Sequence, residues 1–117
     1  MKRRIIIAAV YSGLLLARSP LDRAPPKEAA RLNPFDGQKR AEMAGQRLFR
    51  RECASCHGQE AHGGGRAPGL VSLKSRRAPP GALFWVLRNG SLRRGMPSFA
   101  HLPEPQRWQI ISYLKTL

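Results

Sequence analysis

Residues 53–57 read Cys-Ala-Ser-Cys-His, a C-x-x-C-H run whose side chains can carry covalent and metal chemistry. This spacing is typical of covalent attachment of a c-type haem. Residues three apart on a helix share one face, so the thiols of Cys53 and Cys56 can add to the two vinyl groups on one haem edge. His57 follows directly and can point its imidazole at the iron. We therefore predict one covalently bound haem c per chain, attached through two thioethers.

Two other uses of paired cysteines fit this sequence less well. A disulfide oxidoreductase also has a C-x-x-C motif, but it places the motif in a βαβ context that is missing here. A zinc site needs a second pair of ligands, and the remaining histidines, His62 and His101, match no zinc-finger spacing. The chain has two cysteines in all, which excludes a scaffold of several disulfides.

Composition limits the remaining classes of protein. The chain has 117 residues, enough for one domain, and its 11 glycines and 10 prolines favour short elements joined by long loops. Twenty-one Lys and Arg against seven Asp and Glu give a net charge of +14, which indicates an acidic or anionic partner. Because the sequence contains no nucleic-acid reading motif, we predict no nucleic-acid partner.

The first 17 residues resemble a targeting segment. Lys2, Arg3 and Arg4 precede an apolar run over residues 5–17, which has the length of a secretory h-region and is short for a bilayer span of about 20 residues. We predict a signal peptide or N-terminal anchor over 1–17. A peptidase would cut poorly before Pro20, so an uncleaved membrane tether stays open. The protein is expected to be periplasmic or exported, soluble or anchored at the outer face of the inner membrane.

The rest of the chain divides into an arm and a helical domain. Residues 18–38 contain four prolines and are expected to form a linker or an extended arm, and residues 39–117 are expected to form the domain. Apolar residues at helical spacing predict three main helices. These helices cover residues 41–53, residues 81–88 and the segment that opens with Pro103 and Pro105. The intervening segments, 58–80 and 91–102, are expected to be loops, and no segment alternates as a strand does, so the predicted fold class is all-α.

Residues 38–117 resemble the single-haem class I cytochromes c. Gly45 and Phe49 match the first helix of that family, and Ile110 and Tyr113 match the part of the last helix that contacts it. A glycine at this position lets two helices cross closely because it has no Cβ. The resemblance implies a small cytochrome c-like fold, with long loops wrapped round a covalently bound haem.

Two loops resemble the segments of this family that complete the haem site. Pro68-Gly69-Leu70 resembles the loop after the attachment motif, in which a proline carbonyl accepts the proton of the proximal imidazole. Gly95-Met96-Pro97 resembles the distal-ligand loop. The resemblance therefore implies cofactor binding by Cys53, Cys56, His57, Pro68 and Met96, with His57 and Met96 as the metal ligands. His101 is a rival distal ligand, and Met43 is expected to fill a gap in the core.

The resemblance implies a one-electron carrier in an exported respiratory or dehydrogenase chain, and not an enzyme. Both axial positions of the iron would be filled by protein, which leaves no open site for a substrate. The alternative is a haem c enzyme or sensor domain with a displaceable distal ligand, peroxidase-like or gas-binding. Asn33-Pro34-Phe35 together with Trp108 is similar to cytochromes that accept electrons from periplasmic quinoprotein dehydrogenases, although modules that feed terminal oxidases share much of the pattern.

Arginines and tryptophans complete the set of predicted functional residues. An acidic redox partner would dock on a ring of basic loop residues, and buried propionates would need arginine partners. The predicted docking ring comprises Lys74, Arg76, Arg77, Arg93 and Arg94. The candidate propionate partners are Arg66, Arg76, Arg77 and Arg88. Trp108 is expected to pack in the core, and Trp85 to line the haem pocket.

Overall fold

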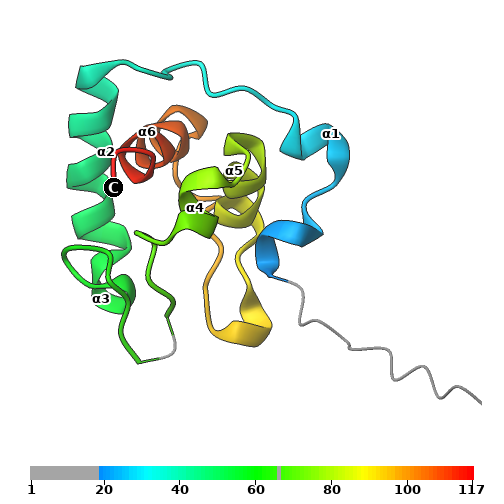
Figure 1. The fold of residues 1–117 in the computed structure, drawn as a ribbon, viewed down its shortest axis with the longest axis vertical. Helices are drawn as coiled ribbons and strands as arrows, with labels where there is room; N and C mark the ends of the chain where they lie inside the picture. Colours follow the sequence, from blue (N-terminus) through cyan, green and yellow to red (C-terminus); the bar gives the residue numbers. More distant parts are fainter. Residues whose placement is uncertain (1–18, 66) are drawn as a thin grey trace, which may run out of the picture.

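The computed structural model describes residues 19–65 and 67–117, and all regular elements in these ranges are helices (Figure 1). In chain order they are η1 (Pro20–Arg23), α1 (Pro26–Ala29), α2 (Lys39–Glu52), α3 (Ala54–His57), α4 (Leu73–Arg77), α5 (Pro80–Asn89), η2 (Leu92–Arg94) and α6 (Glu104–Leu114). The predicted all-α fold is confirmed. The predicted targeting segment, 1–17, lies outside the described residues. No helix within the described ranges is long and apolar enough to cross a membrane.

The three main helices agree with the three predicted from apolar spacing. Helix α2 begins two residues earlier than predicted and buries Ala41, Gly45, Leu48 and Phe49, which share one face at spacings of three and four residues. Helix α6 begins after Pro103 and carries Pro105 in its first turn, where proline costs no hydrogen bond. Helix α5 ends at Asn89 and is capped by Gly90, whose φ of 70° suits a residue without a Cβ.

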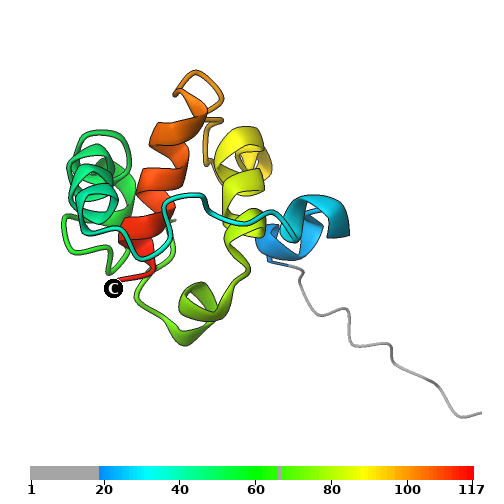
Figure 2. The ribbon, with the colours of Figure 1, turned by 90° about the horizontal axis from the view of Figure 1, so that it is seen from above.

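Helices α2 and α6 form the main contact of the fold, and they lie against each other in both ribbon views (Figures 1 and 2). At their crossing a Cβ on Gly45 would lie 1.8 Å from the backbone oxygen of Gln109, so only glycine fits. Phe49 and Tyr113 fill the space beside this approach, with ring centroids 5.4 Å apart. The predicted contact between the first and last helices is therefore present.

Helix α5 packs on the other side of α6 through aromatic side chains. Phe84 stacks on Trp108 with centroids 4.0 Å apart and an interplanar angle of 15°. The guanidinium groups of Arg31 and Arg107 lie 4.6 and 4.5 Å from the Phe84 centroid, where a cation–π contact contributes to stability. Trp108 is buried, so the prediction that it packs in the core is confirmed.

Residues 19–38, expected to form a linker or an extended arm, contain η1 and α1 and pack against α5 and α6. Helix α1 approaches α5 so closely that a Cβ on Gly81 would lie 2.1 Å from the oxygen of Glu28. Asn33 is buried, and its amide donates to the backbone oxygen of Trp108 (3.3 Å) and to Ser112 Oγ (2.8 Å). The prolines restrict the local conformation, but hydrogen bonds to residues far along the chain fix the position of the arm.

Three further expectations need correction. The loop predicted over 58–80 contains α4, and the loop predicted over 91–102 contains η2. Both helices are short and have no strong apolar pattern, so the spacing of apolar residues did not predict them. Met43 does not fill a gap in the core: it is 51% exposed, since it lies on the face of α2 that points away from α6.

The close crossing of α2 and α6 predicts a large effect of Gly45→Ala. The added methyl group would force two backbones apart, so we expect the free energy of unfolding of the holoprotein to fall by about 3 kcal/mol or more. Denaturant unfolding followed by circular dichroism measures this change. Gly37→Ala is the control, because Gly37 has a φ of 73° and nothing within 4 Å of its added Cβ, and it should cost only about 1 kcal/mol. Equal losses in the two variants would contradict the crossing.

Candidate haem site

The C-x-x-C-H motif lies where α2 ends and a single helical turn begins. Cys53 caps both helices, with φ of −119° and ψ of −29°, and the amides of Cys56 and His57 donate to its carbonyl at 3.2 and 3.0 Å. Cys53 is 8% exposed, whereas Cys56 is exposed and His57 half-buried. Both thiols are free, so this turn presents two sulfur atoms available for thioether bonds.

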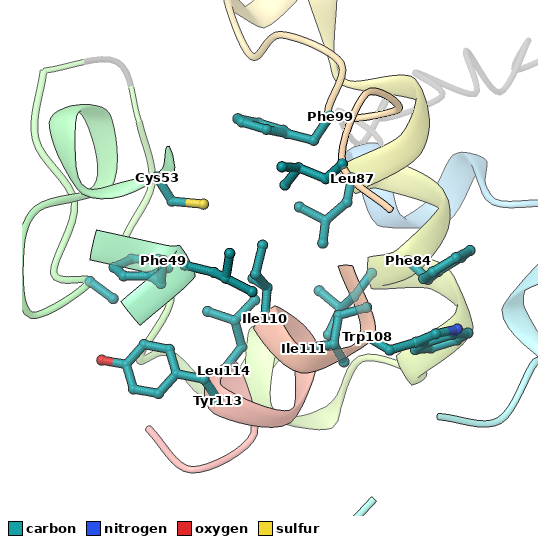
Figure 3. Close-up of a cluster of buried hydrophobic side chains, with 14 of the residues drawn as sticks. Phe49, Cys53, Phe84, Leu87, Phe99, Trp108, Ile110, Ile111, Tyr113 and Leu114 are labelled. Atoms are coloured by element: carbon teal, nitrogen blue, oxygen red, sulfur yellow. The ribbon is translucent and has the colours of Figure 1, made fainter. Parts of the chain in front are cut away.

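The Cys53 thiol points into the apolar interior. In Figure 3 its sulfur points toward the side of the cluster on which Leu87 and Phe99 lie, with Phe49 and Ile110 lower in the view. Burial, with smaller contributions from Glu52 and Cys56, raises the pKa of the Cys53 thiol to about 12. The free side chain is therefore a neutral thiol at pH 7, which is compatible with the apolar wall that a porphyrin requires.

The imidazole of His57 is held by the loop that follows it. Its Nδ1 lies 2.9 Å from the backbone oxygen of Pro68, eleven residues later. A ring nitrogen that donates to a carbonyl leaves Nε2 unprotonated, and that nitrogen can bind a metal. The structure thus brings together His57 and Pro68 as the sequence predicted.

Backbone contacts within residues 58–70 place the Pro68 carbonyl. The amide of Gly63 donates to the oxygen of His57 (2.8 Å), and the amide of Leu70 donates to the oxygen of Ala61 (2.7 Å). Gly63 has a φ of 90°, and a Cβ there would lie 2.7 Å from the nitrogen of Gly69. Ala61 is fully buried at a φ of 57°, which is rare for a residue with a side chain. The loop is therefore tightly constrained beside the imidazole.

Met96 lies in a second constrained loop. Ser91 and Met96 form an isolated antiparallel bridge, with N···O distances of 2.9 and 3.1 Å between their backbones. A Cβ on Gly90 would lie 2.7 Å from the Met96 oxygen, and the amide of Phe99 donates to Leu87 of α5 (2.7 Å). Met96 is half-buried against the core cluster. His101, the rival distal ligand, is exposed.

The donor set of this site fits haem c. It consists of the two thiols on one turn, the His57 imidazole oriented through its Nδ1, and the Met96 thioether at the edge of the apolar core. A family model for the cbb3-type subunit III of cytochrome c oxidase matches residues 40–114, more than half of the chain. The chain belongs to this cytochrome c family. Its cofactor is covalently bound haem c, and it is an electron-transfer protein rather than an enzyme, as the sequence predicted.

The fold of this cytochrome is also found in solved structures. The crystal structure of cytochrome CL from the marine methylotrophic bacterium Methylophaga aminisulfidivorans MPT is similar to it, with a TM-score of 0.61 and 24% sequence identity. The alignment covers 71% of this chain and 57% of that one, so the chain spans less than two-thirds of the length of cytochrome CL. The likeness confirms the cytochrome c fold. No curated protein matches the chain significantly.

Sequence reasoning missed the residues that act through backbone geometry. Ala61 and Ser91 carry no motif of their own, and their roles depend on hydrogen bonds and on a backbone conformation that only the fold reveals. A φ above zero at Ala61 has no sequence signal, because Ala is an ordinary residue in any element. The sequence singles out Asn33 only as part of a motif with Pro34, Phe35 and Trp108, and its hydrogen bond to the Trp108 carbonyl becomes apparent in the fold.

The loop beside the imidazole predicts different effects of two neighbouring glycine substitutions. Gly63→Ala would push the added Cβ into the backbone of residues 67–69 and displace the Pro68 carbonyl, so we expect a loss of about 2–4 kcal/mol in unfolding free energy. Gly65→Ala is the control, because Gly65 also has a positive φ but nothing within 4 Å, and it should cost about 1 kcal/mol. In proton NMR of the reduced holoprotein, the His57 Nδ1 proton should lose its protection from exchange in the first variant only. If it stays protected in both, the Gly63 contacts do not position the carbonyl.

Removing the attachment chemistry should remove the holoprotein. Cys53→Ala with Cys56→Ala leaves the small core without thioether bonds to its cofactor, and we expect at least a tenfold fall in haem-bearing protein, measured by pyridine haemochrome and intact mass. Ser55→Ala, a substitution within the same motif that keeps both thiols, is the control. Normal yields of stable, folded apoprotein from the double variant would show that the fold does not depend on the attached cofactor.

Proposed function

We propose that this cytochrome is an exported one-electron carrier in a respiratory or dehydrogenase chain, with its haem attached through Cys53 and Cys56. His57 and Met96 serve as the axial ligands. The observation that carries the proposal is the 2.9 Å contact between His57 Nδ1 and the Pro68 oxygen. It fixes the tautomer in which Nε2 is free for the iron, and a lone surface histidine would have no reason to be so fixed.

The surroundings of Met96 support its role as the second axial ligand. Its bridge to Ser91 limits the movement of the loop, and its side chain packs, partly buried, against the apolar core. Haem iron held by a histidine and a methionine exchanges a single electron between its ferrous and ferric states, at a raised potential. Protein ligands on both faces leave no coordination site for a substrate, which fits a carrier.

The turn before Met96 has the composition of a docking surface. Leu92 is 76% exposed, and Arg93 and Arg94 follow it in η2. An apolar contact bordered by positive charge favours a redox partner with an acidic surface, and long-range attraction raises the rate of encounter. We propose that this partner is a periplasmic quinoprotein dehydrogenase or a terminal oxidase.

The proposal includes a division of the chain. Residues 1–17 are a signal peptide or N-terminal anchor, residues 18–38 are the arm, and residues 39–117 are the cytochrome domain. Export would bring the two cysteines to an oxidising compartment.

Met96→Ala tests the proposal directly. Loss of the thioether should open the sixth position, admit carbon monoxide or imidazole at neutral pH, and lower the reduction potential by about 0.1 V or more, because axial ligands set haem potentials over about 0.8 V. The weak far-red absorption band of the ferric iron–methionine bond should also disappear. Met43→Ala is the matched control, since Met43 is exposed on α2, and it should leave the band, the potential and ligand exclusion unchanged.

Two outcomes would contradict the assignment. If the unsubstituted ferric protein lacks the far-red band and already binds carbon monoxide when reduced, Met96 is not a ligand. If His101→Ala removes the band while Met96→Ala keeps it, the distal position belongs to the later residue.

A further inference from the structure

A row of arginines runs along the side of α2 that faces away from α6. Residues 40, 43, 47 and 50 repeat at spacings of three and four, so Arg40, Met43, Arg47 and Arg50 lie on one helix face. All four are exposed. The buried residues of α2 occupy the opposite face, and α2 forms one edge of the molecule in both ribbon views (Figures 1 and 2). We call these four residues the α2 ridge.

The positive charges of the α2 ridge are not balanced by the rest of the described chain. Its arginines take part in no ion pair among residues 19–65 and 67–117, whereas the two carboxylates on α2, those of Glu42 and Glu52, pair with Lys39 and Arg51 on its flanks. Like charges three or four residues apart destabilise a helix. The ridge therefore weakens α2 in isolation, and an external anion would relieve that repulsion.

The α2 ridge differs from a typical protein-binding surface. Protein interfaces are centred on large aromatic or aliphatic anchors in pockets, and Met43 is the only apolar side chain among the four. The ridge also lacks aromatic residues, on which a single-stranded nucleic acid would stack. Guanidinium groups in a line on a convex helix instead suit a plane of phosphates, and Met43 can enter the headgroup region between them.

We propose that the α2 ridge docks this cytochrome on a membrane that contains anionic phospholipids, through contacts between its arginines and lipid phosphates. The docking surface is separate from the turn before Met96, because η2 does not lie on the α2 edge of the molecule (Figure 1). The cytochrome can thus bind the lipid surface and its redox partner at the same time. The inference needs no particular axial ligand or redox partner, so its failure would leave the proposed carrier function intact.

The test is the partitioning of the purified holoprotein onto vesicles of phosphatidylglycerol and phosphatidylcholine, compared with vesicles of phosphatidylcholine alone. Any insertion of residues 1–17 would occur on both kinds of vesicle. The ratio of the two partition coefficients therefore isolates the contribution of the anionic lipid to binding. Combined Arg40→Gln, Arg47→Gln and Arg50→Gln should reduce that ratio between tenfold and about 100-fold at low salt, because each basic residue near an anionic surface strengthens binding several-fold. Raising the salt concentration should reduce the ratio of the unsubstituted protein in the same direction.

The control removes the same charge from elsewhere on the surface. Arg23→Gln, Lys27→Gln and Arg93→Gln replace three exposed residues outside α2, and the ratio should fall by less than threefold. Circular dichroism and the Soret spectrum should be unchanged in both triple variants. Equal losses in the two variants would show adhesion by net charge alone and overturn the proposal. So would an unchanged ratio in the ridge variant, or ridge-dependent binding to polyglutamate or DNA without binding to the anionic vesicles.

Discussion

The close approach of two backbones at Gly45 and Gln109 positions the end of α2 that carries the first thiol of the haem site. Because α2 lies directly on α6, the C-terminal end of α2 places Cys53 with its side chain directed inward, in the same buried cluster as Ile110. Phe49 and Tyr113 then close the outer side of the crossing. A methyl group at the crossing would move the Cys53 thiol away from the interior. Gly45 therefore controls the position of a reactive side chain although it has none itself.

The two predicted axial ligands are presented in the same physical way. Neither His57 nor Met96 lies in the middle of a long helix, and each belongs to a short segment that is held by paired backbone hydrogen bonds. The loop over 58–70 returns the Pro68 carbonyl to the imidazole, and the bridge from Ser91 fixes the turn before Met96. Glycines at Gly63 and Gly90 permit close backbone approaches that no other residue would allow. Rigid loops reduce the reorganisation that accompanies electron transfer, which suits a carrier.

The parts of this structure that follow from local spacing were predictable, and those that follow from distant contacts were not. Apolar periodicity located α2, α5 and α6, and the motif with its following Pro68 located the imidazole and its acceptor. The exposure of Met43 was missed because methionine commonly fills gaps in apolar cores, although its spacing from Arg40 and Arg47 places it on the charged face of α2. The stack of Phe84 on Trp108 was missed because the two rings lie 24 residues apart, and the hydrogen bond from Asn33 to Ser112 was missed because no short pattern encodes a pairing over 79 residues.

Asn33 also determines where the independently folding unit begins. A fragment that started at Lys39 would remove the buried Asn33 amide from the Ser112 hydroxyl and the Trp108 carbonyl, which would keep only part of their hydrogen bonding through the 3.1 Å bond between them, and it would uncover Gly81 where α1 packs. Buried polar groups that lose their partners cost more than the hydrogen bonds contributed. A piece of this chain that keeps both contacts must therefore include α1 and Asn33, well upstream of its first long helix.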